Sequence, residues 1–325
     1  MNSGLRWVSA TAVGRLLRCP VSVTPRARPD IPAAHAPDNA GSLAHLALGV
    51  WLESGGWNDE DPGAALQAAW DAEAERWGIH WRRLREGVVV RARLRSRGAE
   101  LAHLVTSAGR RAQSEVFLTD DTTGIYGALD VIVDDGDGGG AVIDLKSGRD
   151  VVGTLDEAVR IQLLMYAHLF RAKYGKLPTT VAAFSLIRGA VPIEFSVEEV
   201  DELIERVHEV RAMKDAVASP DEVGCRYCSR RLRCDPHWVA AKEWPKPDCV
   251  EGRLTKIERA AAGMIALRVE TPTTTEWVTN LDAHQATNLP AIGEHLRVVR
   301  ISQRRHTEWV ASTVTRVGPK ASSTD

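Results

Sequence analysis

A short stretch in the middle of the chain places charged residues inside two apolar segments. Gly124–Asp134 and Gly140–Lys146 have the composition of β-strands, and the Gly/Asp-rich run that joins them predicts a hairpin turn. Side chains alternate along a strand, so Asp144 and Lys146 share one face, and the hairpin brings Asp130 beside them. Neighbouring carboxylates repel each other unless a cation neutralises them, and hard oxygen ligands suit Mg²⁺ or Mn²⁺. Surface charge on a hairpin is the alternative, because an Asp-x-Lys triplet is common by chance.

The order of predicted elements around this hairpin indicates the fold class. Helical periodicity precedes the hairpin and strand-like segments and amphipathic helices follow it, which favours an α/β core with a mixed sheet flanked by helices. The predicted helices are Ser9–Leu17, a segment from Asn39, Pro62–Trp77, one between Leu84 and Ala108, Asp156–Tyr174 and Val197–Val217; the further strands are Gln113–Leu118, Val181–Arg188 and Pro192–Phe195.

The last quarter of the chain is rich in candidate strands. We expect a first domain over residues 1–236, a linker over 237–248, a small β-barrel over 249–318 and a tail over 319–325. Five candidate strands, with a helical stretch at Asp282–Asn288 between the third and the fourth, are typical of an OB-like barrel.

Composition limits the partners and the compartment. The 325 residues carry a formal net charge of −2, so a nucleic-acid-binding surface requires segregated charge. Arginines are dense between Trp81 and Arg111. This stretch is either a phosphate-contacting surface or an ordinary solvated helix face. Without a secretory signal or an apolar run of about 20 residues, we expect a cytoplasmic protein and no membrane partner, with a transit peptide as the weaker alternative.

Four of the five cysteines form a potential metal-binding set. Cys225, Cys228 and Cys234 give the spacing C-x2-C-x5-C, and Cys19 supplies a distant fourth thiol. Four cysteines suit either tetrahedral zinc or a [4Fe–4S] cluster. Cys249 lies outside this set.

Together with other landmarks in the right order, the hairpin resembles the PD-(D/E)xK nuclease superfamily and, within it, the RecB-like branch. That branch includes the RecB and AddB nuclease domains and the CRISPR-associated iron–sulfur exonucleases. The resemblance covers about Ser9 to Pro236. The matching positions are the G-x-x-x-H element Gly41 to His45, the strand residue Glu115, the G-x-x-D pair Gly127 and Asp130, the D-x-K triplet Asp144 to Lys146, and the Q-x-x-x-Y pair Gln162 and Tyr166.

The resemblance implies a role for each of these residues. His45, Asp130, Asp144 and the Leu145 carbonyl would bind Mg²⁺ or Mn²⁺. Lys146 would orient the attacking water, Glu115 would be a further acidic catalytic residue, and Gln162 and Tyr166 would position the substrate or the lysine. The cysteine pattern of the AddB and CRISPR exonuclease families favours a structural [4Fe–4S] cluster at Cys19, Cys225, Cys228 and Cys234, with zinc as the less favoured occupant.

The expected function is therefore that of a metal-dependent deoxyribonuclease. An exonuclease or end-processing nuclease on single-stranded or end-containing DNA would fit, in repair, recombination or foreign-DNA handling. The sequence has no G-x-x-x-x-G-K-[ST] run, so a separate helicase would supply any motor. A DNA-binding module and a ribonuclease are the rival readings. Candidate DNA contacts are Arg82, Arg83, Arg110, Arg111, Trp277, Arg304, Arg305 and Trp309, although the two tryptophans could equally be barrel core.

Overall fold

The computed structural model of the 325-residue chain describes residues 7–24, 27–31, 35–148, 155–260 and 262–320. Its contacts divide into two compact units. The first contains the described residues up to Leu17 and from Val23 to Met213, and the second contains Arg18–Ser22 and the chain from Lys214 onward. Residues 321–325, predicted as part of the tail, lie outside the described residues.

The first unit is built on a mixed sheet, as the sequence predicts. The main path of the sheet is β1-β3-β4-β5-β6, and β2 pairs with β3. Pairing is parallel between β1 and β3 and between β4 and β5, and antiparallel between β2 and β3, β3 and β4, and β5 and β6. The strands are β1 (Val8–Ser9), β2 (Arg111–Asp120), β3 (Ile125–Asp134), β4 (Gly140–Lys146), β5 (Thr180–Ser185) and β6 (Gly189–Pro192).

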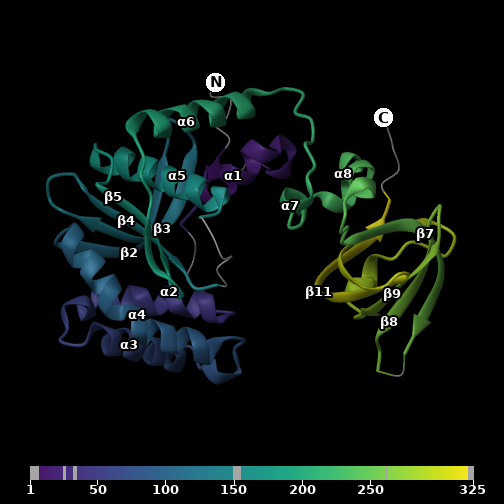
Figure 1. The fold of residues 1–325 in the computed structure, drawn as a ribbon, viewed down its shortest axis with the longest axis horizontal. Helices are drawn as coiled ribbons and strands as arrows, with labels where there is room; N and C mark the ends of the chain where they lie inside the picture. The colour runs from purple at the N-terminus through teal and green to yellow at the C-terminus, as the bar shows by residue number, and fades with distance from the viewer. Residues whose placement is uncertain (1–6, 25–26, 32–34, 149–154, 261, 321–325) are drawn as a thin grey trace. The chain divides into compact units, whose positions relative to one another are not determined.

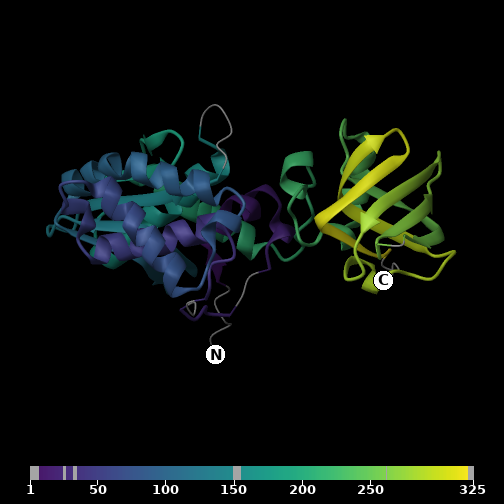
Figure 2. The same ribbon diagram turned by 90° about the horizontal axis from the view of Figure 1, so that it is seen from below.

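Helices cover both faces of this sheet (Figures 1 and 2). On one face lie α2 (Ala40–Glu53), α3 (Pro62–Arg76) and α4 (Gly87–Ala108); on the other lie α1 (Ala10–Arg18), α5 (Glu157–Tyr174) and α6 (Val197–Ala212). Because side chains alternate along β4, this strand contributes to both hydrophobic cores. Ala141 and Ile143 pack with α2–α4, whereas Val142 packs with α5. Asp144 has the same parity as Val142, so the α5 side of the sheet is where the charged residues of β4 lie.

One predicted strand is shorter than expected. The sequence pattern indicates a strand over Val181–Arg188, but β5 ends at Ser185 and a three-residue turn leads into β6. The Ser185 hydroxyl accepts hydrogen bonds from the backbone N–H groups of Ile187 and Arg188, at 3.1 and 3.2 Å. A serine side chain that satisfies backbone donors in this way favours a turn over a continued strand.

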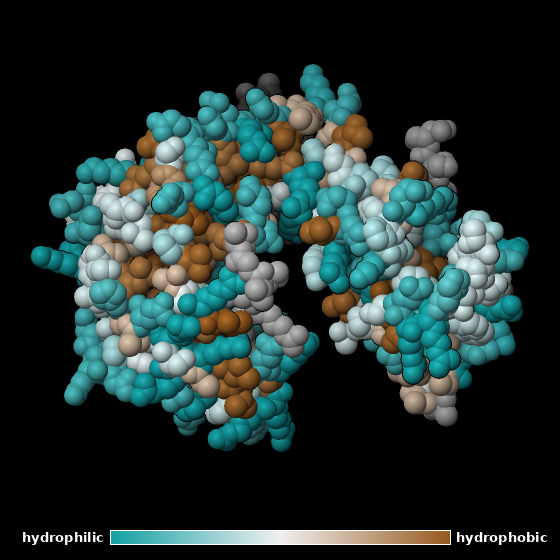
Figure 3. All heavy atoms as spheres, in the orientation of Figure 1, coloured by the Kyte–Doolittle hydropathy of each residue, from teal (hydrophilic) through white to brown (hydrophobic). Residues whose placement is uncertain are grey.

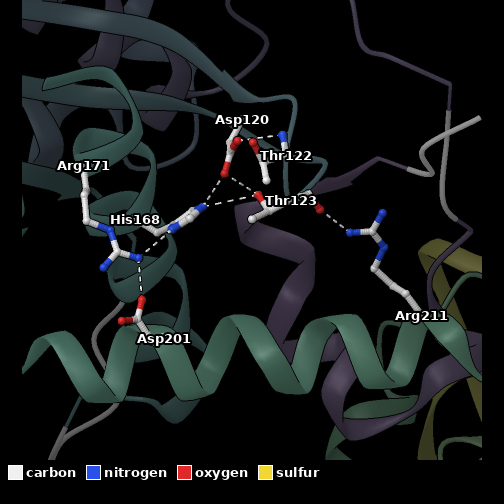
Figure 4. A network of polar contacts seen from close by, with 7 residues as sticks. All are labelled: Asp120, Thr122, Thr123, His168, Arg171, Asp201 and Arg211. Carbon is white, nitrogen blue, oxygen red and sulfur yellow. Dashed lines mark hydrogen bonds and ion pairs between the residues drawn. The ribbon is translucent and has the colours of Figure 1, made fainter. Parts of the chain in front are cut away.

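A polar network fixes the turn between β2 and β3 to the helices on the α5 side (Figure 4). The Asp120 carboxylate accepts hydrogen bonds from the Thr122 N–H and the Thr123 hydroxyl, both at 2.8 Å, and lies 2.8 Å from Nε2 of His168 on α5. Arg171 lies between His168 and Asp201 of α6, 2.6 Å from the latter, and Arg211 donates to the Thr123 carbonyl. The turn that precedes β3, the strand that carries Asp130, is thereby held to α5 and α6.

The second unit contains a closed five-stranded barrel. Its strands are β7 (Cys249–Arg259), β8 (Ile265–Glu270), β9 (Thr275–Leu281), β10 (His295–Arg305) and β11 (Glu308–Pro319). They pair in the cyclic order β7-β8-β9-β11-β10, with β9 and β11 parallel and the other pairs antiparallel. A short 3-10 helix, Gln285–Asn288, lies between β9 and β10, within the predicted helical stretch.

Short helices precede the barrel. They are α7 (Glu222–Cys225) and α8 (Asp235–Ala240), followed by a 3-10 turn at Ala241–Glu243. Residues 237–248, predicted as a linker, thus include regular structure, and Trp238 packs with Cys249 and Val299 of the barrel.

The surface of each unit is mostly hydrophilic on the face shown in Figure 3, and the hydrophobic residues visible there form separate groups. Within the described part of the chain, none of the helices combines the length and the apolar character that crossing a membrane requires.

Candidate active site

The landmark residues of the first unit come from five elements. His45 lies on α2, Glu115 on β2, Asp130 on β3, Asp144 and Lys146 on β4, and Gln162 and Tyr166 on α5. They form two adjoining groups, linked where the backbone N–H of Leu145 donates to Oδ2 of Asp130 at 2.6 Å. Pairing of β3 with both β2 and β4 brings the strand residues into one neighbourhood, as the hairpin pattern predicts.

The first group is His45, Glu115 and Asp130. Nδ1 of His45 lies 3.2 Å from Oδ1 of Asp130 and 3.4 Å from Oε1 of Glu115. One ligand atom from each of the three residues lies within 4.8 Å of the other two, a spacing that a single metal ion can bridge. Glu115 has a φ of 50° in the middle of a strand, a left-handed conformation that is unusual for a residue with a side chain. Such local strain is concentrated at functional sites.

The charge balance of this group favours a cation. Burial lowers the pKa of His45, but hydrogen bonds with Asp130 and Glu115 and the charges of both carboxylates outweigh it and raise the pKa to about 10. In the absence of a metal ion, the imidazolium supplies the positive charge that two adjacent carboxylates require. The same donor set, with neutral imidazole nitrogen and two carboxylate oxygens, is suited to Mn²⁺ or Mg²⁺.

The second group is built around the buried Asp144. Nζ of Lys146 lies 2.6 Å from Oδ2 of Asp144, and the Gln162 side chain donates from Nε2 to Oδ1 at 2.9 Å. Lys146 also donates to Oε1 of Gln162 at 3.3 Å, and Nε2 of Gln162 lies 3.0 Å from the Tyr166 hydroxyl. Gln162 and Tyr166 are one helical turn apart, so α5 presents both to the carboxylate–lysine pair.

Asp144 is the least satisfied charge of this group. Its side chain is 3% exposed, and the ion pair with Lys146 at 2.6 Å is the one compensating contact of Oδ2 among the described residues. Burial and the charge of Asp130 raise the pKa of Asp144 to about 6, against the attraction of Lys146. Burial and the same two carboxylates also raise the pKa of Tyr166 above its ordinary value. The centre thus sets three carboxylates against two cationic groups, His45 and Lys146, and a bound cation would offset the remaining negative charge.

Two glycines of the motifs, Gly127 and Gly41, stand where a side chain would be too close to its neighbours. A Cβ at Gly127 would lie 2.9 Å from Cε1 of Tyr166, and one at Gly41 would lie 2.8 Å from Oγ of Ser147, just after β4. Both distances are shorter than real Cβ contacts, so the absence of a side chain allows α5 and α2 to approach the strands that carry the site.

The arrangement differs in one respect from the ligand set that the resemblance implies. Glu115 stands with His45 and Asp130, whereas Asp144 stands with Lys146 and Gln162. Leu145 contacts Asp130 through its N–H.

The four cysteines of the predicted set all belong to the second unit. Cys19 lies in the short segment Arg18–Ser22, and its sulfur accepts a hydrogen bond from the Ser219 N–H at 3.4 Å. Burial raises the pKa of Cys225 to about 11, with contributions from Cys228 and Cys234, and burial raises that of Cys234, with contributions from Cys19 and Cys228. The four thiols are thus close enough to influence one another electrostatically. Among the described residues, no three of their sulfurs lie within 4.8 Å of one another.

The candidate DNA contacts divide into two kinds. Trp309 is 6% exposed, packs in the barrel core and donates to Glu276 at 3.0 Å, so it cannot stack a base, and its prediction as a contact is wrong. Trp277 is half-buried. Exposed side chains are found at Arg82, Arg83, Arg110, Arg111, Arg304 and Arg305. Arg304 and Arg305 both face Glu308, at 3.6 and 3.9 Å.

Part of the arginine-rich stretch has a structural use. Arg91 forms a two-point ion pair with Asp71, Arg95 forms another with Asp61, and Arg97 pairs with Glu100. The pairs with Asp71 and Asp61 connect α4 to α3 and its N-cap, and the pair with Glu100 lies within α4; all three reduce the charge available for phosphates.

Comparisons with known proteins give a family but no curated relative, because no curated protein matches. Among solved structures, similarity extends to the tetrameric p202 HIN2 (12% identity, 23% of this chain and 42% of that chain, TM-score 0.20), the p204 HINb domain (11%, 40% and 58%, 0.20) and a murine DNA binding protein bound with ds DNA (12%, 48% and 78%, 0.21). This chain therefore covers less than two thirds of the first two structures, and TM-scores at this level support no conclusion. The sequence model of the PD-(D/E)XK nuclease superfamily matches residues 8–235, which include the hairpin, the His45 group and all four clustered cysteines, so the chain belongs to this superfamily of metal-dependent nucleases.

Proposed function

We propose that the first unit hydrolyses phosphodiester bonds in DNA with Mg²⁺ or Mn²⁺ held by His45, Glu115 and Asp130. The observation that carries this proposal is the convergence of these three ligand groups beside the Asp144–Lys146 pair. Asp144 also belongs to the expected ligand set. The charge of Asp130 raises the pKa of Asp144, so the two carboxylates are close, and Asp144 would share the cation's charge. The Leu145 carbonyl is retained as a further ligand on the resemblance alone.

The chain's own residues would perform the remaining work. A bound divalent cation supplies positive charge for the scissile phosphate and acidifies a water. Lys146 would orient the attacking water and offset negative charge that develops on the phosphate, because its ammonium is fixed by Asp144 and Gln162. Gln162 would fix the orientation of both partners, since its amide contacts Asp144, Lys146 and Tyr166.

For the substrate, we propose single-stranded or end-containing DNA, cut from an end or near it, in repair, recombination or foreign-DNA handling in the cytoplasm. The barrel supports this, since parallel pairing of its third and fifth strands and the helix between its third and fourth match the OB-like pattern. We assign residues 1–236 to the RecB-like nuclease domain and residues 249–318 to the barrel, and we propose a separate helicase as partner.

At the cysteine set we propose a structural [4Fe–4S] cluster held by Cys19, Cys225, Cys228 and Cys234. The cysteine pattern of the AddB and CRISPR exonuclease families, an N-terminal cysteine with a distant C-x2-C-x5-C, supports the cluster, and zinc is the alternative occupant of a four-cysteine site. Iron and acid-labile sulfide in the purified protein, with a visible absorbance band that Cys19→Ala removes, would support the cluster; zinc alone in a colourless protein would refute it.

The test of the nuclease is cleavage of labelled single- and double-stranded DNA with Mn²⁺ by the wild-type and Lys146→Ala chains, with free and blocked ends. We expect cleavage by the wild type only, and weaker cleavage when the ends are blocked. Equal products from both proteins would end the assignment. Faster cleavage of a matched RNA would favour a ribonuclease, and DNA binding without cleavage would favour a binding module.

A further inference from the structure

The loop that carries the cysteines exposes an aromatic side chain among arginines. Tyr227, between Cys225 and Cys228, is 70% exposed. Arg226, Arg230 and Arg233 are also exposed, and the eleven residues from Gly224 to Cys234 contain no Asp or Glu. A tyrosine that packed in a core would be buried, so this one does not contribute to folding through its ring.

The backbone of this loop is fixed from inside the second unit. Arg231 is 1% exposed, forms a two-point ion pair with Asp248 and donates to the Arg226 carbonyl at 3.2 Å. Arg300 of β10 donates to the Tyr227 carbonyl at 3.0 Å. Two guanidinium groups therefore hold the main chain at Arg226 and Tyr227, between Cys225 and Cys228, while the Tyr227 side chain is exposed.

Arg300 is a cation whose hydrogen-bonding groups are only partly satisfied. It has a φ of 62° at a register shift in β10, a strained conformation for a non-glycine residue. Its buried Nε has no hydrogen-bond partner in the described part of the chain. The exposed Arg316 lies across from Val299, one residue away along β10, and burial together with the charges of Arg316 and Arg231 lowers the pKa of Arg300. Like charges held together in this way are offset when an anion binds.

We infer that this surface, the arginines around Tyr227 together with Arg300 and Arg316, binds single-stranded DNA, with a base stacked on Tyr227 and phosphates on the arginines. The inference rests on the proposed function, because it names a binding surface for the same substrate. An exposed aromatic ring can stack only with a base that is not paired in a duplex, and the surrounding arginines can bind the phosphates of the DNA backbone. The surface lies at the β10 bulge and the cysteine loop, not at Trp277 and the Arg304–Arg305 turn, where OB-like barrels are expected to bind.

The experiment is a binding titration on the full-length protein without divalent metal, in the Lys146→Ala background so that no cleavage intervenes. The probes are a fluorescein-labelled dT20 strand and a labelled 20-base-pair blunt duplex, followed by anisotropy. The variants are Tyr227→Ala, Tyr227→Phe and Arg316→Gln. The matched control is Arg259→Gln, an exposed arginine of the same barrel, ten residues along β7 from the Cys249–Val299 pair.

We expect Tyr227→Ala to weaken dT20 binding at least about fivefold, the lower limit for loss of one stacked base, and to change duplex binding less than about twofold. Tyr227→Phe keeps the ring and should bind dT20 like the parent. Arg316→Gln should reduce the slope of log affinity against log salt by about 0.7, the value for one phosphate contact on a single strand, and Arg259→Gln should leave it unchanged.

Unchanged dT20 binding by Tyr227→Ala, or an equal loss on single strand and duplex, would overturn the inference. An equal slope change in Arg259→Gln and Arg316→Gln would do the same, because it would indicate a diffuse charge effect. Iron content and circular dichroism of each variant confirm that the loop is intact. Mn²⁺-dependent cleavage by the chain with wild-type Lys146 is measured separately, so the nuclease can stand when this surface fails.

Discussion

The two candidate centres of the molecule are built from opposite kinds of structure. The carboxylate–lysine centre takes its residues from long helices and central strands of a three-layer unit, with hydrophobic cores on both faces of the sheet. Three of the four cysteines instead lie on or beside a four-residue helix and a 3-10 turn, near a small core around Trp238. We therefore expect the first centre to keep its geometry without a metal ion and the second to depend on the group that it binds.

Buried charge is used differently in the two regions. At the first centre, Asp144 lacks full compensation, which costs stability and serves a bound cation. In the second unit, Arg231 and Arg297 are fully buried and fully engaged, the first with Asp248 and the second with Glu251 and Asp235. Buried charge thus serves metal binding in the first unit, whereas in the second unit it stabilises the fold through ion pairs.

The largest expected effect separates activity from folding in the first unit. Asp144→Asn should reduce Mn²⁺-dependent cleavage by about 1000-fold, since it removes a charge that acts on the reacting groups. The melting temperature of the metal-free protein should stay the same or rise, because burial of the ionised carboxylate is unfavourable. Cleavage rates and calorimetry on the same preparations test this, and a variant that unfolds would contradict the view that the scaffold sets this geometry.

Loss of a cysteine should act on folding instead. Cys225→Ser should remove the bound iron and destabilise the second unit by several kcal/mol, because binding of a structural metal group is coupled to folding. Hydrogen exchange should rise in peptides from α7, α8 and β10 and stay unchanged in β3 and β4. Cys249→Ser, outside the set, is the control. Uniform exchange in both units would show that the two centres do not differ in this way.

The buried ion pair of Arg231 should contribute more to the free energy of unfolding than a more exposed pair of similar geometry. Arg231→Met leaves Asp248 without its partner and should cost about 3–5 kcal/mol. Arg91→Met, at a half-exposed pair with Asp71 in the first unit, should cost about 1 kcal/mol or less. Urea unfolding followed by hydrogen exchange of each unit measures both, and equal costs would contradict the structural role of Arg231.

The smallest effect concerns acid pH and the network of Figure 4. Burial lowers the pKa of His168 in spite of Asp120, with Arg171 and Asp201 as its other charged neighbours. A depressed histidine pKa means that the unfolded chain binds the proton more readily, so this contribution is present above about pH 6.5 and is lost as the pH falls. His168→Gln should flatten the fall in melting temperature of the first unit between pH 7 and 5, and an unchanged slope would contradict this.

Much of the first centre could be predicted from the sequence because its motifs lie on regular elements. Strand alternation predicts that Asp144 and Lys146 share a face, and helical spacing predicts that Gln162 and Tyr166 do. The grouping of Glu115 with His45 and Asp130 could not be predicted, because it depends on a left-handed φ at Glu115 and on how α2 packs against β2. The helix within the predicted linker is short and lacks a periodic pattern, so its place depends on contacts of Trp238.

The nucleic-acid contacts are the part of the molecule that the sequence predicts least well. Trp309 alternates with half-buried residues at the start of β11, and only barrel closure decides which parity faces inward. The arginines of α4 resemble one basic face in the sequence, yet Asp61 and Asp71 neutralise two of them through tertiary contacts, and Glu100 neutralises Arg97 within the helix. Exposure at Tyr227 carried no sequence signal beyond its place between two cysteines.

The most direct test of the account is the Mn²⁺ dependence of DNA cleavage by the wild-type and Asp130→Asn chains. Asp130 contacts His45 and the Leu145 N–H and belongs to the candidate metal group, and asparagine preserves its volume. We expect wild-type cleavage of a single-stranded oligonucleotide to rise with Mn²⁺ to saturation and to stop with a chelator, and we expect Asp130→Asn, although folded, to give no product above background. Equal cleavage by both chains, or wild-type cleavage that survives the chelator, would contradict this expectation.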